Sequence, residues 1–146
     1  MNGRDDLLKA LKHYQRLYLK LSEGVRNKYH ISQTEFDVVA FLNNHPNSNT
    51  AKDICDIRML TKSNVSVAVD NLSKSGFLAC AVDGQDRRVT RLRFLPKADS
   101  LREEVRLVQS EFSRVLIDGI SQAEVDQFLD TLSKISRNAA EKMGEK

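Results

Sequence analysis

The chain has 146 residues, 40% of them hydrophobic and 29% charged, which is typical of one globular domain with a substantial core. Its formal net charge of +3 permits nucleic acid binding but does not demand it. Two cysteines are too few for a disulfide framework, no apolar run approaches the length of a membrane span, and the first thirty residues do not read as a signal peptide. We therefore expect a cytoplasmic protein with no membrane partner.

The first predicted element is a helix from Asp5 to about Lys28. Its apolar residues recur at alternating spacings of four and three, which makes a heptad-like seam along one face. These residues are Leu7, Leu11, Tyr14, Tyr18, Leu21 and Val25. A helix with such a seam needs a partner, which is either the core of its own domain or a second subunit.

The second predicted helix spans residues 32–44. Ser32 and Glu35 form a capping-box pattern at its beginning, and His45-Pro46-Asn47 ends it. We interpret this helix as the scaffold on which the following elements pack.

Two short helices then follow, and each opens on a threonine. Thr50 precedes Asp53 in a second capping-box pattern, and Thr61 opens a helix that runs to Ser75-Gly76. A turn of about three residues between them predicts a helix-turn-helix. In the first of the two helices we expect Ile54, Cys55 and Ile57 to be buried. In the second, the apolar face consists of Val65, Ala68, Val69 and Leu72.

A predicted hairpin comes next, because residues 77–82 and 89–95 are rich in β-forming residues and flank a polar loop that carries Gly84. Helix, turn, helix and hairpin in this order indicate a winged helix-turn-helix. The loop and the strand after it carry four arginines that suit phosphate oxygens or a narrow minor groove. They are Arg87, Arg88, Arg91 and Arg93.

The helix that opens at Thr61 carries mostly short side chains away from its apolar face, as a helix that enters a major groove requires. The candidate DNA-binding residues there are Lys62, Ser63, Asn64, Ser66 and Val67. Taken alone, this helix is better interpreted as an ordinary amphipathic surface helix. The basic hairpin that follows it favours DNA binding.

After the hairpin, Pro96 is suited to opening a helix, Gly119 ends it, and Ser121 with Glu124 forms a further capping box. Both helices of this region carry heptad-like seams. We therefore predict one mainly α domain over residues 1–146. Residues 31–95 form its winged helix-turn-helix, and residues 1–30 and 96–146 are helices that hold two copies together.

The hairpin region resembles the wing signature of the MarR family of transcriptional regulators. The matching residues are Gly76-Phe77-Leu78, Asp83, Asp86-Arg87-Arg88 and Leu92-Arg93-Phe94-Leu95. The resemblance implies a homodimer that binds a short inverted repeat and is often released by a small ligand. It also implies a ligand cleft beside the dimer helices, for which His13, Tyr14 and Tyr18 are candidates, although the tyrosines suit seam packing equally well.

Four residues depart from the family pattern. Cys80 and Val67 stand where arginines are common, and Pro96 and Asp99 stand where threonine and glycine are usual. These departures imply weaker electrostatic anchoring and a different base preference, with Val67 suited to a thymine methyl group.

Other chemistry has little support in the sequence. It has no glycine-rich phosphate loop, nucleophile elbow or zinc-binding cluster, so we expect no enzymatic activity, no cofactor and no metal. We expect Cys55 and Cys80 to be bystanders. The predicted function is that of a sequence-specific regulator of transcription, a ligand-responsive repressor that binds a palindromic double-stranded DNA operator as a homodimer. The alternative is a winged-helix module that binds another protein without reading DNA.

Overall fold

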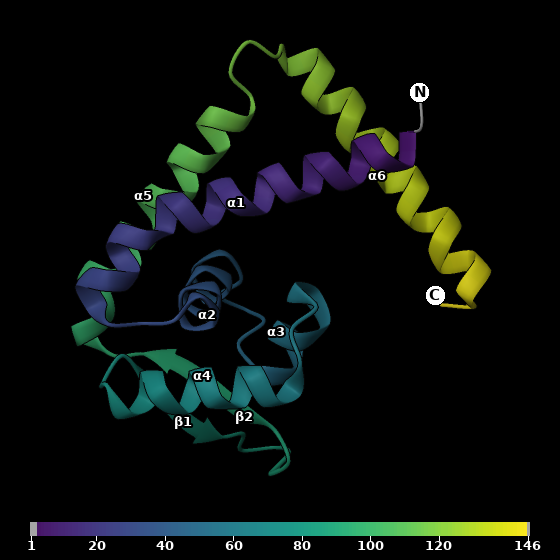
Figure 1. Cartoon of the computed structure of the whole chain (residues 1–146). Helices are drawn as coiled ribbons and strands as arrows, with labels where there is room; N and C mark the ends of the chain where they lie inside the picture. Colours follow the sequence, from purple (N-terminus) through teal and green to yellow (C-terminus); the bar gives the residue numbers. More distant parts are fainter. Residues whose placement is uncertain (1–2, 146) are drawn as a thin grey trace. The chain divides into compact units, whose positions relative to one another are not determined.

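The computed structural model describes residues 3–145 and shows a mainly α fold with one antiparallel hairpin (Figure 1). The predicted fold class, a winged helix-turn-helix flanked by helices, is confirmed. In chain order the elements are α1 (Gly3–Tyr29), α2 (Gln33–Asn44), α3 (Ala51–Arg58), α4 (Lys62–Lys74), β1 (Leu78–Val82), β2 (Thr90–Phe94), the 3₁₀ turn η1 (Pro96–Ala98), α5 (Asp99–Leu116) and α6 (Gln122–Met143).

The chain divides into two compact units, one that ends at Phe112 and one that begins at Ser113. The grouping of residues 1–146 into a single domain stays a prediction. Between residues 3 and 145, no helix has both the length and the apolar character needed to cross a membrane.

The helix beginnings agree with the capping patterns in the sequence. The side chains of Ser32, Thr50 and Ser121 each accept a hydrogen bond from the backbone N–H of the residue three positions later. The carboxylate of that later residue in turn accepts a hydrogen bond from the backbone N–H of the cap residue. Thr61 accepts in the same way from the N–H of Asn64. These reciprocal bonds satisfy N–H groups that a helix end otherwise leaves without partners, so they define where each helix starts.

In the unit that ends at Phe112, α2 is the central element. It lies between α1 and α4 in Figure 1, and the hairpin follows beyond α4. Phe36 and Phe41 of α2 are fully buried, together with Ile54 from α3 and Leu72 from α4. The predicted scaffold role of this helix is therefore confirmed, since the helix-turn-helix packs directly on it.

The wing is joined to the helices by its backbone as well as by its side chains. Strands β1 and β2 pair antiparallel from Leu78 opposite Phe94 to Val82 opposite Thr90. The N–H of Leu92 donates to the carbonyl of Asn49 at 2.8 Å, and a β-bridge joins Thr50 to Arg91. The loop between α2 and α3 thus pairs with β2 through one isolated bridge and one further hydrogen bond, and it anchors the base of the wing.

Three expectations need correction. Ile57 is 54% exposed, because the buried face of α3 lies on the side of Ala51 and Ile54. Cys55 is only partly buried at the edge of the core. Pro96 opens a 3₁₀ turn, and the α-helix itself begins at Asp99.

The unit that begins at Ser113 contains the last turn of α5 and the whole of α6. Gly119, with φ of +74°, adopts the left-handed conformation that lets the chain turn between the two helices. Most of the large apolar side chains of α6 are substantially exposed. They include Phe128 (63%), Leu129 (55%), Leu132 (48%) and Ile135 (59%).

Candidate nucleic-acid interface

Helix α4 has one buried face and one exposed face, and the candidate base-reading residues lie on the exposed one. Val65, Ala68 and Leu72 are buried against the core, which fixes how the helix is rotated about its own axis. The predicted DNA-binding side chains of this helix are all exposed. They are Lys62, Ser63, Asn64, Ser66 and Val67, the last at 61%.

A shallow hollow of about 150 Å³ runs along α4 and adds residues that the sequence reasoning missed. Its walls combine the beginning of α2 with the exposed face of α4. The lining residues are Ser32, Thr34, Asn64, Val67, Ala68 and Asn71. Thr34 and Asn71 therefore belong to the same surface as the predicted base readers. The capping box at Ser32 shows where α2 begins, but nothing in the local sequence shows that this beginning lies against α4.

The tip of the wing is organised by two carboxylates. Asp83 Oδ1 accepts the backbone N–H groups of Gln85 at 2.8 Å and of Asp86 at 3.1 Å. Asp86 Oδ1 accepts the backbone N–H of Arg88 at 3.0 Å and its Nε at 3.2 Å. The Arg88 side chain stays 91% exposed, so Asp86 orients this guanidinium without covering it. Both bonds to Arg88 hold the pKa of Asp86 below its usual value.

Arg87 stands beside this pair and is exposed. Within residues 3–145, its side chain has no hydrogen-bond or ion-pair partner. The tip therefore offers one oriented and one unengaged guanidinium, a pair well suited to phosphate oxygens.

Arg91 is engaged differently from the other two arginines. Its Nε donates to Asp83 Oδ2 at 2.8 Å, and its Nη1 donates to Asn49 Oδ1 at 3.1 Å. The Arg91 guanidinium, with the N–H groups of Gln85 and Asp86, lowers the pKa of the Asp83 carboxyl to about 2. Arg91 thus joins the wing to the α2–α3 loop, and its contact with DNA stays a prediction.

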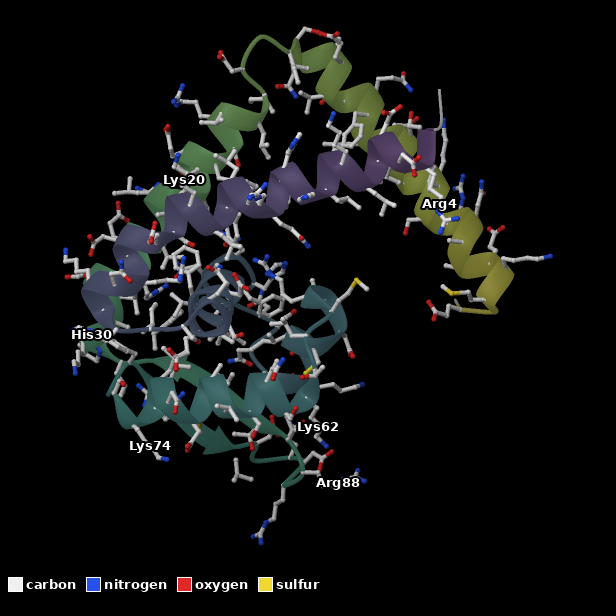
Figure 2. The ribbon with its side chains drawn as sticks, in the orientation of Figure 1. Arg4, Lys20, His30, Lys62, Lys74 and Arg88 are labelled. Atoms are coloured by element: carbon white, nitrogen blue, oxygen red, sulfur yellow. The ribbon has the colours of Figure 1, made fainter. Side chains whose placement is uncertain are left out.

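The charged ends of α4 differ in their surroundings. Figure 2 shows Lys62 at the beginning of α4 on the same side of the unit as Arg88, with Lys74 at the other end of the helix. Both lysines are exposed, but Lys74 pairs with Asp70 at 2.7 Å, whereas Lys62 has no ion-pair partner among residues 3–145. Lys62 and the cations of the wing tip therefore lie towards the N-terminal end of α4.

The structure separates the three candidate ligand residues. The rings of Tyr14 and Tyr18 pack edge-to-face on Phe112, with centroids 4.7 and 5.0 Å away, and Tyr18 also packs on Phe36 at 5.7 Å. His13 is exposed on another face of α1. The hydroxyl of Tyr18 is buried without a hydrogen-bond partner in the described part of the chain, and burial, together with the charge of Asp37, raises the pKa of Tyr18.

The remaining candidate chemistry is sparse. Cys80 is exposed on β1, with its Sγ 3.3 Å from Ser73 Oγ, and Cys55 is half-buried. Within residues 3–145, no group of three or more His, Cys, Asp or Glu side chains is placed to hold a metal ion. The bystander role of the cysteines stays a prediction.

A capped helix with an exposed polar face, beside a hairpin that carries arginines at its tip, defines the class of winged helix-turn-helix DNA-binding proteins. Comparisons with known proteins agree. Residues 31–89 match the family model of the MarR family. The HTH-type transcriptional regulator YsmB of Bacillus subtilis (strain 168) is 23% identical over 137 residues, which cover 94% of this chain and 93% of that protein.

Solved structures show the same fold. The transcriptional regulator PA3341 superimposes with a TM-score of 0.81 at 19% identity, covering 95% of this chain and 98% of its own. A MarR-family regulator from Listeria monocytogenes, solved with a 26mer DNA, superimposes with a TM-score of 0.78 at 18% identity and covers 95% of each chain. The winged helix-turn-helix at residues 31–89 belongs to the MarR family, and the chain is a DNA-binding transcriptional regulator.

Proposed function

We propose that two copies of this chain bind one inverted repeat in double-stranded DNA and repress transcription from it, acting in the cytoplasm. In this proposal α4 of each copy lies in a major groove, and the wing reaches the adjacent minor groove or its phosphates. The observation that carries the proposal is the convergence of exposed Lys62, Ser63 and Asn64 with Arg88 at one end of α4. The role is one of binding, with no catalytic step.

The two parts of this surface have different tasks. Arg87 and Arg88 anchor the protein on phosphates, which are the same in every sequence. Asn64 and Ser66 meet base edges, and Val67 meets a thymine methyl group. Arg91 acts through Asp83 and Asn49 to hold the wing in place.

Pairing of two copies is supported by apolar surface that one chain leaves uncovered. In α1, the side chains of Leu7, Leu11 and Tyr14 are between 49% and 59% exposed. They belong to the same apolar seam as Tyr18, which is half-buried against the core. The seam of α6 is equally exposed at Phe128 and Ile135. A second copy of the chain covers such faces in a symmetric dimer.

Release by a small ligand is also part of the proposal. Its support is the aromatic cluster of Tyr14, Tyr18 and Phe112, together with the hydroxyl of Tyr18, which is buried without a partner among residues 3–145. A ligand that offers a hydrogen-bond acceptor to this hydroxyl satisfies it and shifts the equilibrium towards the state that binds the ligand.

Two substitutions test the division between anchoring and reading. A preferred duplex is first selected from a random library, and each variant is then titrated on that duplex and on unrelated DNA at several salt concentrations. Arg88→Ala should weaken binding to both DNAs and lower the slope of log affinity against log salt by about one unit. Asn64→Ala should weaken binding mainly on the selected duplex and leave the slope nearly unchanged.

Lys74→Ala is the matched control, because Lys74 is a cation of the same helix at the end away from the wing tip. It should change neither binding nor slope. If no duplex is selected, and if Arg88→Ala leaves non-specific binding unaltered, the surface is not a DNA interface. A protein partner for the wing then becomes the better explanation.

A further inference from the structure

A basic stripe lies on α1, away from the surface described above. Lys9, Lys12, His13, Arg16 and Lys20 define it, and all five are exposed. From Leu7 to Ser22 the chain carries no acidic residue. Over the described residues, the four Lys and Arg side chains of the basic stripe make no ion pair or side-chain hydrogen bond.

The geometry of the helix gathers these residues on one face. Successive residues of a helix are rotated by about 100°, so Lys9, His13, Arg16 and Lys20 lie in one row along the helix over three turns. Lys12 lies beside this row. The stripe is about 17 Å long, the rise of eleven helical residues. Asp5 and Glu23 stand at its two ends on the same side of α1.

The basic stripe stays accessible in the proposed dimer. Its centre lies about 160° around the helix from the apolar seam that begins at Leu7 and ends at Val25. The C-terminal half of that seam faces the chain's own core, and its exposed N-terminal half is the part assigned to a second copy. Covering the seam therefore leaves the opposite face of α1 in water.

The stripe is also remote from the winged surface. In Figure 2, Lys20 lies on α1 at the opposite end of the unit from Lys62, Lys74 and Arg88. A duplex bound along α4 and the wing therefore does not reach the stripe.

We propose that the basic stripe of α1 is a second, sequence-independent binding site for double-stranded DNA, so that one dimer holds two duplexes at once. The exposed Leu8 and Leu19 lie only at the edge of the stripe, beside Lys12, and its centre carries none of the aromatic or aliphatic anchors on which protein interfaces depend for affinity. A row of unpaired cations instead suits a phosphate backbone, which carries one charge about every 1.7 Å along the duplex. For a regulator already bound to DNA, neighbouring duplex is also the polyanion at the highest effective concentration.

The proposal rests on the proposed function, because the dimer must first occupy DNA through its wings. The test uses the full chain loaded to saturation on bead-bound selected duplex. A labelled, unrelated duplex is then added, and its capture is measured as salt is raised. The wild type should capture the second duplex at low salt and release it as salt increases.

Two triple variants at the same positions isolate the effect of charge. Replacing Lys9, Lys12 and Lys20 by Gln should reduce capture of the second duplex about tenfold or more and flatten its salt dependence by up to about 2.7 units of log–log slope. Replacing the same three residues by Arg should keep capture within about twofold of the wild type, because the cations remain. Both variants should load on the first duplex as the wild type does.

Several results would overturn the proposal. One is equal capture by the Gln triple and the wild type, and another is no capture by the wild type once it is loaded. A third is preferential displacement of the captured duplex by polyglutamate at matched charge, which would assign the stripe to an acidic protein. Failure of the wild type to load on the first duplex is a separate outcome that counts against the proposed function. In that case the stripe is tested by direct capture of duplex on protein tethered through its C-terminus, with the Gln triple again expected to lose it.

Discussion

The unit that ends at Phe112 buries its large apolar residues, and the unit that begins at Ser113 exposes them. Phe36 in α2 is fully buried, whereas Phe128 in α6 is 63% exposed, although both belong to regular, capped helices. The contrast shows that capping and periodicity are enough to make a helix, while burial of its apolar face needs a partner. In α2 that partner is the rest of the unit, and in α6 it is the second copy that we propose.

The same substitution at these two phenylalanines should therefore have different consequences. Phe36→Ala should lower the free energy of unfolding by about 3–5 kcal/mol, because it opens a cavity in a closed core. The loss should be the same at every protein concentration. Phe128→Ala should instead give a loss that depends on concentration, because it acts through association. Thermal unfolding of both variants over a wide concentration range measures this difference.

Charged residues on the seam of α6 should break the proposed dimer. Phe128→Asp combined with Leu132→Asp should leave a folded monomer in sedimentation and weaken binding to the selected duplex about a hundredfold or more, because the two half-sites are no longer bound together. Gln127→Asp with Asn138→Asp places the same charges on polar positions of the helix and should have no such effect. A double seam variant that remained dimeric would remove α6 from the interface.

Arg91 in the wing allows a test of whether a residue positions the wing or contacts DNA directly. Asp83→Asn removes the carboxylate that holds Arg91 but leaves its cation in place. If Arg91 positions the wing, affinity for both DNAs should fall about two- to fivefold, the range expected for one exposed ion pair. Titration of the variant at several salt concentrations measures the change.

A gain in affinity would mean the opposite, since removing a negative charge strengthens a cation that contacts phosphates directly. Arg91→Ala separates the two cases further. As a positioning residue it should lower affinity without changing the salt slope, whereas Arg88→Ala should change both.

Tyr18 allows a smaller test within the closed unit. Its hydroxyl is buried without a partner among the described residues, so Tyr18→Phe should raise stability or leave it unchanged, by up to about 1 kcal/mol. Tyr14→Phe is the control, because Tyr14 is 49% exposed and its hydroxyl is not confined in the same way. A clear loss of stability in Tyr18→Phe, measured by chemical denaturation, would show that the hydroxyl has a partner in solution.

The smallest expected effect is a loosening of the wing in acid. The pKa of Asp83 falls from 3.8 to about 2 in the folded chain, so ionised Asp83 stabilises the wing above pH 4. This contribution should be lost as the pH falls from 4 towards 2. The backbone N–H groups of Gln85 and Asp86, which donate to Asp83, report it by NMR. In Asp83→Asn these two amides should lose the part of the transition that Asp83 causes, while Asp86 still titrates.

Local features of this fold were predictable from the sequence. Each cap at Ser32, Thr50, Thr61 and Ser121 involves residues no more than three apart, so the pattern that encodes it is visible directly. The hairpin was predictable for a similar reason, because its two strands flank a short polar loop. The exposed polar face of α4 followed from the spacing of Val65, Ala68 and Leu72.

Features that join distant parts of the chain were not predictable in this way. Arg91 contacts Asn49, which is 42 residues away, so its engagement in the wing could not be inferred from the loop alone. Ile57 was misplaced because α3 is only eight residues long, and over such a length a spacing of three does not show which side of the helix will be covered. Thr34 joined the candidate interface only through the packing of α2 on α4.

The hydrogen bonds of the wing distinguish a base that is fixed to the α2–α3 loop from a tip that is closed mainly by its own residues. The base is bonded to Asn49 and Thr50, whereas the tip is closed by carboxylates of its own loop, with Asp83 and Asp86 accepting N–H groups two or three residues away. The side chains of Gln85 and Arg87 take no part in these bonds, so substitutions at these two positions leave the sheet undisturbed. The tip can therefore change how firmly the wing anchors on phosphates while α4, which reads the bases in our proposal, stays the same.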